Sequence, residues 1–183
     1  MDIKNIAVLV GSLRKESYNR KVARQMIQQA PDALQLEIVE IGNLPLYNED
    51  LEKAVPEAWS NFREIMRSKD GVIFVTPEYN RSVPGLLKNA IDVGSRPYGK
   101  SVWEGKPGAV ASVTPGGLGA FGANHHLRQS MVFLNVPVMQ QPEAYISNIA
   151  GCFDEQGNMV SDQLKELLNN FLQSYDRWVR QFE

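Results

Sequence analysis

Residues 3–19 read IKNIAVLVGSLRKESYN, an aliphatic run that leads into a glycine and then a polar turn. The run Ile3–Val10 has the nearly continuous aliphatic character of a strand buried on both faces in a parallel sheet. Apolar residues then recur at helical spacing from Val22 to Ala30, and Pro31 ends that pattern. A buried strand followed at once by an amphipathic helix predicts the opening of an α/β fold.

The rest of the chain repeats this alternation. Further strands are expected over residues 36–41, 71–76, 109–114 and 136–139. Glu37 and Glu40 indicate that the second strand lies at or near the edge of the sheet. Helices are expected to open at Pro56 and Pro84, near residues 124–134, and along the apolar stripe 164–179. Ser161 or Asp162 would be the N-cap of the last helix.

Five strands interleaved with five helices predict one doubly wound domain over residues 1–183. The strands would form a parallel sheet in the flavodoxin-like order 2-1-3-4-5 with helices on both faces, because a full Rossmann fold needs six strands and more residues. Ligands of such folds bind outside the carboxyl ends of the strands, where the strand order reverses. The loops after the first, third and fourth strands are therefore the candidate site.

Composition excludes several classes of protein. The chain carries 19 Lys and Arg against 21 Asp and Glu, a net charge of −2 that argues against nucleic-acid binding. The longest apolar runs are far short of a membrane span, and residues 1–10 lack the pattern of a signal peptide. Cys152 is the single cysteine and has no internal disulfide partner. His125 and His126 are adjacent and poorly placed to share a metal ion. We therefore expect a cytoplasmic protein with no metal site and no membrane insertion.

The first loop, residues 11–19, leaves a buried strand for a helix N-terminus, where free N–H groups and the helix dipole favour an anion. Ser12, Ser17 and Asn19 supply neutral donors, and the planar guanidinium of Arg14 suits a bidentate phosphate contact. An ordinary capping turn with surface charges is the alternative interpretation. A phosphate site and a simple turn both remain open for this loop taken alone.

The second loop, residues 77–85, reads PEYNRSVPG. Its two prolines restrict the backbone and so preset the directions of its N–H and C=O groups. A planar ring rich in heteroatoms could be bound by such a stiff peptide edge, and Tyr79 adds aromatic surface. The alternative is a loop that merely joins a strand to a helix. The exposed tyrosine between Glu78 and Asn80 favours the binding interpretation.

The third loop, residues 114–124, reads TPGGLGAFGAN and contains a literal G-x-G-x-x-G at Gly117, Gly119 and Gly122. An acid follows about twenty residues later at Glu143, as the dinucleotide-binding fingerprint requires. However, the motif follows the fourth strand, whereas the fingerprint closes the first strand–helix unit. We therefore interpret it as a flexible glycine loop through which the backbone approaches a flat ligand.

The chain resembles the NADPH-dependent FMN reductase family in two motifs, and most of all its bacterial chromate and quinone reductase branch. The motifs read G-S-x-R-x-x-S-x-N over residues 11–19 and P-E-Y-N-x-S-x-P-G over residues 77–85. The likeness extends over essentially the whole chain. It implies a flavodoxin-like fold that binds FMN non-covalently, with the phosphate on the first loop and the isoalloxazine ring between the other two. The implied cofactor-binding residues are Ser12, Leu13, Arg14, Lys15, Ser17, Tyr18, Asn19, Pro77, Glu78, Tyr79, Asn80, Ser112, Gly116 and Gly117.

The resemblance also implies an activity. NADPH or NADH would reduce the bound FMN, and after the oxidised nicotinamide leaves, a small acceptor would receive the electrons at the same site. Quinones are the expected acceptors, and chromate is a further candidate. We assign no protein acid, base or nucleophile, since the cofactor carries the chemistry. Members of the family are typically homodimers or homotetramers, and the segments Asn89–Asp92 and Arg96–Gly99 are candidates for that contact.

Two other functions compete with this hypothesis. A flavodoxin-type electron carrier shares the fold and FMN, but such carriers usually have a Ser/Thr- and Gly-rich phosphate loop and a strongly acidic surface. This chain has Arg14 in that loop and a nearly neutral charge balance. A phosphate-binding hydrolase on the same fold would need a nucleophile–base pair, and the sequence offers no recognisable one.

Overall fold

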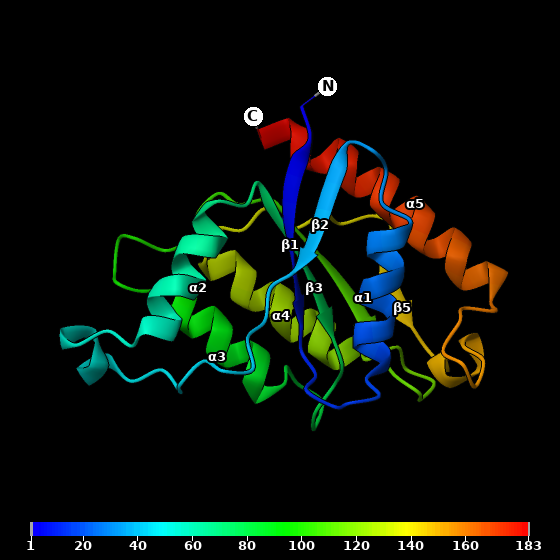
Figure 1. Ribbon diagram of the computed structural model, residues 1–183, viewed down its shortest axis with the longest axis horizontal. Coiled ribbons are helices and arrows are strands. Elements are labelled where there is room, and N and C mark those ends of the chain that lie inside the picture. Colours follow the sequence, from blue (N-terminus) through cyan, green and yellow to red (C-terminus); the bar gives the residue numbers. More distant parts are fainter. Residues whose placement is uncertain (1, 183) are drawn as a thin grey trace.

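The computed structural model describes residues 2–182, which form a five-stranded sheet with helices on both faces (Figure 1). The strands are β1 (Lys4–Val10), β2 (Leu34–Ile38), β3 (Gly71–Thr76), β4 (Gly108–Val113) and β5 (Ala144–Ile146). The α-helices are α1 (Tyr18–Gln28), α2 (Glu57–Arg67), α3 (Gly85–Gly94), α4 (Phe121–Phe133) and α5 (Asp162–Val179). The short 3-10 helices are η1 (Glu49–Lys53), η2 (Ile149–Cys152) and η3 (Arg180–Phe182). All neighbouring strands are parallel in the order β2-β1-β3-β4-β5, which confirms the predicted fold and the edge position of β2.

Serine caps begin two of the helices. The Ser17 Oγ accepts a hydrogen bond from the Arg20 N–H over 3.3 Å at the start of α1. The Ser161 Oγ accepts one from the Leu164 N–H over 3.2 Å at the start of α5. Each bond satisfies one of the N–H groups that a first helical turn leaves free. Ser161, and not Asp162, is therefore the cap of the last helix.

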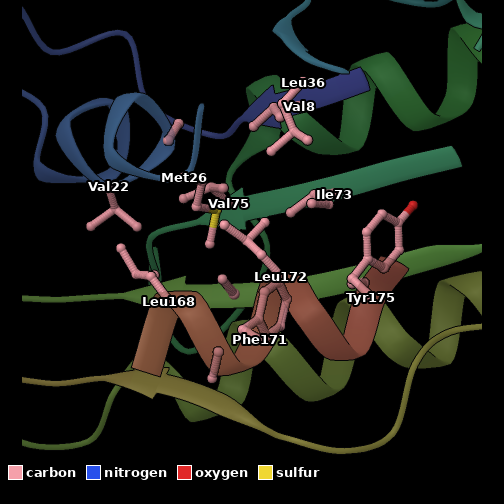
Figure 2. Packing of buried hydrophobic residues seen from close by; sticks show 14 of the residues in the cluster. Val8, Val22, Met26, Leu36, Ile73, Val75, Leu168, Phe171, Leu172 and Tyr175 are labelled. Carbon is pink, nitrogen blue, oxygen red and sulfur yellow. The ribbon is translucent and has the colours of Figure 1, made fainter. Parts of the chain in front are cut away.

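Two apolar clusters hold the layers together. Helices α1 and α5 cover one face of the sheet, and α2, α3 and α4 cover the other (Figure 1). Successive side chains of a strand point to opposite faces, so Val8 packs under α1 and α5 while Leu9 packs under α2 to α4. Figure 2 shows the first cluster, with residues from β1, β3, α1 and α5 in contact. Full burial of one such side chain contributes about 1.5–3 kcal/mol, so the sheet is a firm base for its loops.

The fifth strand differs from the sequence-based expectation. The segment 136–139 makes only a bridge between Val138 and Gly108 at the beginning of β4. The strand itself, β5, pairs with the other end of β4, opposite Ala111–Val113. Pro137 and Pro142 lack an N–H and cannot donate to the ladder, so the pairing along β4 is split between two short segments. The expectation of a strand over 136–139 is therefore wrong.

Helix α4 begins three residues before the expected start near residue 124. Its N-cap Ala120 and the preceding Gly119 both have left-handed backbone, with φ of 54° and 59°. The glycine loop is therefore shorter than expected, and Gly122 lies inside the helix. Among residues 2–182, every helix is too short or too polar to span a lipid bilayer.

Candidate functional site

The loops that follow β1, β3 and β4 meet at the carboxyl edge of the sheet around a hollow of about 230 Å³. Eight of the predicted site residues line it: Ser12, Arg14, Ser17, Tyr18, Asn19, Pro77, Glu78 and Tyr79. Val113, Thr114 and Pro115 complete the lining; sequence reasoning placed Thr114 and Pro115 in the third loop but assigned none of the three to cofactor binding. Their position at the end of a buried strand, directly before the glycines, is the signal that could have identified them. The other predicted residues, Leu13, Lys15, Asn80, Ser112, Gly116 and Gly117, do not line the hollow.

The first loop leads into the N-terminus of α1. Ser12 and Ser17 are buried there, whereas Arg14 and Lys15 are exposed. The first turn of α1 contains no acidic side chain, and Glu16, which directly precedes the N-cap Ser17, is in an ion pair with Lys21 at 3.6 Å. The combination of this helix end with Arg14 and Lys15 makes the first loop suited to a phosphate.

Asn19 extends the site from the helix end toward β4. It is 5% exposed, and its Nδ2 donates to the Val113 carbonyl over a long 3.5 Å. Among residues 2–182, its buried Oδ1 has no hydrogen-bond partner. An unpaired buried acceptor costs about 1–3 kcal/mol, and a donor supplied by a ligand in the hollow would remove that cost.

The second loop contains a tight turn that the two prolines did not reveal. Tyr79 and Ser82 exchange two backbone hydrogen bonds of 3.0 Å, and the central residues Asn80 and Arg81 have positive φ of 50° and 65°. Positive φ at both central residues defines a type I′ turn, which accepts Asn readily and Arg at some cost. The turn leaves Tyr79 51% exposed at the edge of the hollow.

Contacts with α4 hold this second loop in place. The Glu78 carboxylate accepts a hydrogen bond from the Ala123 N–H over 3.1 Å at the N-terminus of α4, and Arg81 contacts its other oxygen at 3.3 Å. His126 Nδ1 lies 2.9 Å from the Ser82 hydroxyl. The carboxylate of Glu78 is thus engaged by the helix end, where a negative charge is favourable.

The third loop presents bare backbone. Gly116 and Gly117 are exposed, and a Cβ added at Gly117 would meet no atom within 4 Å. The Gly116 carbonyl accepts from Asn148 over 3.1 Å, and the Gly117 carbonyl accepts from the Ser147 hydroxyl over 3.2 Å. Residues next to β5 therefore hold the backbone of these glycines in place. The space around the glycines is open enough for a side chain, so packing within the protein does not explain their lack of one.

A cluster of aromatic and titratable side chains flanks the third loop and was missed by sequence reasoning. The Tyr145 hydroxyl donates to Glu143 over 2.8 Å, and His125 Nε2 lies 2.9 Å from the same hydroxyl. The Phe121 ring lies against His125, with 4.1 Å between ring centroids. Burial and the Glu143 carboxylate raise the pKa of Tyr145 to about 12. Glu143 therefore serves a local contact, and the glycine motif lies between β4 and α4, whereas the dinucleotide fingerprint closes the first strand–helix unit.

Comparison with known proteins identifies the family. The model of the NADPH-dependent FMN reductase family matches residues 4–151. A quinone reductase of Pseudomonas putida is 61% identical over 179 residues, covering 97% of this chain and 96% of its own. A 2-hydroxy-1,4-benzoquinone reductase of a Burkholderia species is 44% identical over 175 residues, covering 96% of each chain.

A solved structure agrees with these relatives. The flavoenzyme FerB of Paracoccus denitrificans, an NAD(P)H:(acceptor) oxidoreductase, superposes with a TM-score of 0.92 at 37% identity, over 98% of this chain and 99% of its own. These similarities favour the reductase hypothesis over the electron carrier and the hydrolase. The chain belongs to the NADPH-dependent FMN reductase family, with FMN as its cofactor and NADPH or NADH as its electron donor.

Proposed function

We propose that this protein is a quinone reductase that passes electrons from NAD(P)H to quinones through FMN held at the carboxyl edge of the sheet. The observation that carries the proposal is the hollow in which residues of three loops meet an unpaired, buried Asn19 oxygen. The naming of several relatives as quinone reductases supports the acceptor class.

The chemistry of the donors around the hollow fits FMN. The end of α1 with Ser12, Arg14 and Ser17 would hold the phosphate, aided by the backbone near Leu13 and by the nearby Lys15 and Tyr18. A phosphate dianion accepts hydrogen bonds and cannot donate one, whereas a ribityl hydroxyl can donate to the Asn19 Oδ1. Asn19 therefore fits the sugar-alcohol chain between the phosphate and the ring.

The other two loops fit a flat ring. Tyr79 offers an exposed aromatic surface, and the turn through Asn80 fixes the peptide edge beside it. Gly116 and Gly117 leave room for the ring to approach the backbone from the opposite side. Pro77 and Glu78 are held by the sheet and by α4, so this edge is rigid before a ligand arrives.

Bound FMN supplies the redox chemistry, by taking electrons from the nicotinamide and giving them to the acceptor. The chain contributes binding, orientation and a fixed arrangement of N–H dipoles at the ring edge. No separate nicotinamide-binding unit is present among residues 2–182, so donor and acceptor would use the same crevice in turn. We keep chromate within the proposal as a further acceptor.

The proposal includes a homodimer or homotetramer. Tyr98 and Phe133 are 90% and 84% exposed, an unusual exposure for large apolar side chains, and Val132, next to Phe133 in the sequence of α4, is 81% exposed. Phe133 lines a hollow of about 570 Å³ between α3 and α4, and the segment Arg96–Gly99 lies at its end. The free thiol of Cys152 suits a reducing compartment, and we propose the cytoplasm.

The test is a direct one. The purified protein should be yellow or become so with added FMN, should bleach when NADPH or NADH is added without oxygen, and should regain its colour when benzoquinone follows. A protein that binds no FMN would overturn the proposal. A reduced protein that benzoquinone fails to reoxidise would overturn the acceptor class and leave the family unaffected.

A further inference from the structure

A series of hydrogen-bonded polar side chains, the half-buried Arg128 and the buried Asn124 and Ser112, connects α4 to the third loop. The Arg128 Nε donates to the Asn124 Oδ1 over 2.9 Å, and the Asn124 Nδ2 donates to the Ser112 Oγ over 3.1 Å. The Ser112 hydroxyl in turn donates to the Gly119 carbonyl over 2.6 Å. Ser112 and Asn124 are both 0% exposed. Neither side chain presents any surface from which it could touch a ligand.

Arg128, the first residue of this series of hydrogen bonds, fixes the direction of each bond in it. A guanidinium can only donate, so the amide oxygen of Asn124 must face Arg128 and its NH₂ must face Ser112. The Ser112 oxygen is then an acceptor toward Asn124, and its single hydrogen is available for the Gly119 carbonyl. The next acceptor for that hydrogen, the Ala144 carbonyl, is more distant at 3.4 Å. Arg128 thereby determines the direction of the last hydrogen bond in the series, from Ser112 to the Gly119 carbonyl.

The carbonyl that receives this bond belongs to a residue with little freedom. Gly119 has φ of 59°, and a Cβ there would lie 2.6 Å from the Tyr145 Cβ. It follows directly on the exposed stretch that contains Gly116 and Gly117. These two glycines are held through Ser147 and Asn148 on one side, and the Ser112 bond holds the other end of the loop.

Helix α4 also holds the second loop, through the contacts of Ala123 with Glu78 and of His126 with Ser82. One helix therefore fixes both loops that flank the proposed ring site. Its Ala123 N–H and His126 reach one loop, and its Asn124 reaches the other. A change in the setting of α4 would move the two walls of the ring site relative to each other.

We propose that Asn124 and Arg128 are positioning residues for the flavin ring, acting through Ser112 and the Gly119 carbonyl. This inference rests on the proposed function, because it assumes that the ring lies between the two loops. It predicts that the polar chain contributes to binding of the ring and not to binding of the phosphate. The two contributions can be separated, since riboflavin has the ring and lacks the phosphate.

The experiment compares the affinities of riboflavin and FMN in single variants of the full chain. Ser112→Ala removes the donor to Gly119, and Asn124→Asp accepts from Arg128 but cannot donate to Ser112. Both variants should weaken riboflavin and FMN by the same factor, at most about tenfold, because the net free energy of one buried hydrogen bond limits what it contributes to holding the loop. They should also shift the absorption band of the bound flavin, which reports the surroundings of the ring.

Tyr175→Phe is the matched control. It also deletes one buried hydroxyl bonded to a main-chain carbonyl, that of Pro107 at 2.9 Å, but at the opposite end of β4. It should lower the melting temperature and leave both flavin affinities unchanged. Arg14→Ala should weaken FMN alone.

Three outcomes would overturn the inference: wild-type riboflavin affinity in Ser112→Ala, an equal loss of affinity in Tyr175→Phe, or a loss confined to FMN. If Asn124→Asp fails to fold, Arg128→Gln takes its place, because its amide can donate to Asn124 without fixing the direction of the chain, and riboflavin should again bind more weakly. Failure of the wild-type protein to bind any flavin would overturn the proposed function itself, which distinguishes the two.

Discussion

Asn19 lies in the first turn of α1, where its Oδ1 is buried and unpaired among residues 2–182. Replacing it by leucine, which has a similar shape and no polar atom, removes this acceptor from the protein without ligand. The same substitution removes the partner that we assign to a ribityl hydroxyl of FMN. The apoprotein and the complex should therefore respond to Asn19→Leu in opposite directions.

The expected magnitude follows from the two ends of the amide. Removing an unsatisfied buried acceptor contributes about 1–3 kcal/mol to the stability of the apoprotein, and losing the long bond to Val113 costs about 0.5–1.5 kcal/mol. The net gain of about 1 kcal/mol corresponds to a rise in melting temperature of about 2–4 °C for a domain of this size. Loss of the bond to FMN should weaken its binding by roughly twofold to tenfold.

Asn89→Leu is the matched control for this prediction. Asn89 is buried in α3, where its Oδ1 accepts from the Tyr47 N–H over 2.8 Å and its Nδ2 contacts the Leu44 and Pro45 carbonyls. The helix propensity changes in the same sense at both positions. Because the Asn89 amide is fully used, its replacement should lower the melting temperature by several degrees.

Thermal denaturation of the apoproteins and fluorescence titration with FMN provide the two measurements. If Asn19→Leu destabilises the apoprotein as much as Asn89→Leu does, the Asn19 oxygen is satisfied without ligand and our reasoning about this site fails. If the apoprotein is stabilised while FMN binds as in the wild type, the assigned contact with the ribityl chain is wrong.

Three further predictions concern other parts of the site. Arg14→Ala should weaken FMN by about 1.5–3 kcal/mol in a titration while the melting temperature of the apoprotein hardly changes, because the side chain is exposed; equal affinities would refute its phosphate role. The pKa of Tyr145 is raised to about 12 from 10, so the stability that this shift contributes is complete below pH 10 and is lost as the pH rises toward 12. The free energy of unfolding, measured in urea between pH 8 and 12, should therefore fall less in Tyr145→Phe than in the wild type. Gly119→Ala should destabilise the apoprotein by at least about 1–3 kcal/mol, since φ is positive and the new methyl group meets Tyr145. Gly117→Ala should leave the melting temperature of the apoprotein unchanged and weaken the binding of FMN. Equal behaviour of the two variants would contradict the structure.

The sequence pattern was sufficient for the strand order and for most of the lining of the hollow. Buried strands are recognisable because both of their faces are apolar, and the loops that follow β1 and β3 could be located because they come directly after such strands. The split of the fifth strand could not be predicted in the same way. The run 136–139 is as apolar as a strand, and only the three-dimensional pairing along β4 decides which segment is its partner.

The interactions between loops were equally hidden. The two prolines of the second loop predicted a rigid backbone, but they did not predict its type I′ turn. That turn depends on two consecutive residues with positive φ, one of which is Arg81. Glu78 looked like a free ligand for the cofactor, yet its carboxylate is bound by the N-terminus of α4 from a segment 45 residues later in the chain. Contacts between residues this far apart leave no periodic signal in the sequence.

The parallel order of β1, β3 and β4 has a consequence for the way in which the protein acquires its cofactor. The paired residues of β1 and β3 lie more than sixty positions apart, so their alignment requires closure of a long segment of chain, and we expect it to come late in folding. The binding hollow does not exist until all three strands are in register. FMN therefore binds to a nearly complete fold. Its binding lengthens the lifetime of the native state and has little influence on the rate of folding.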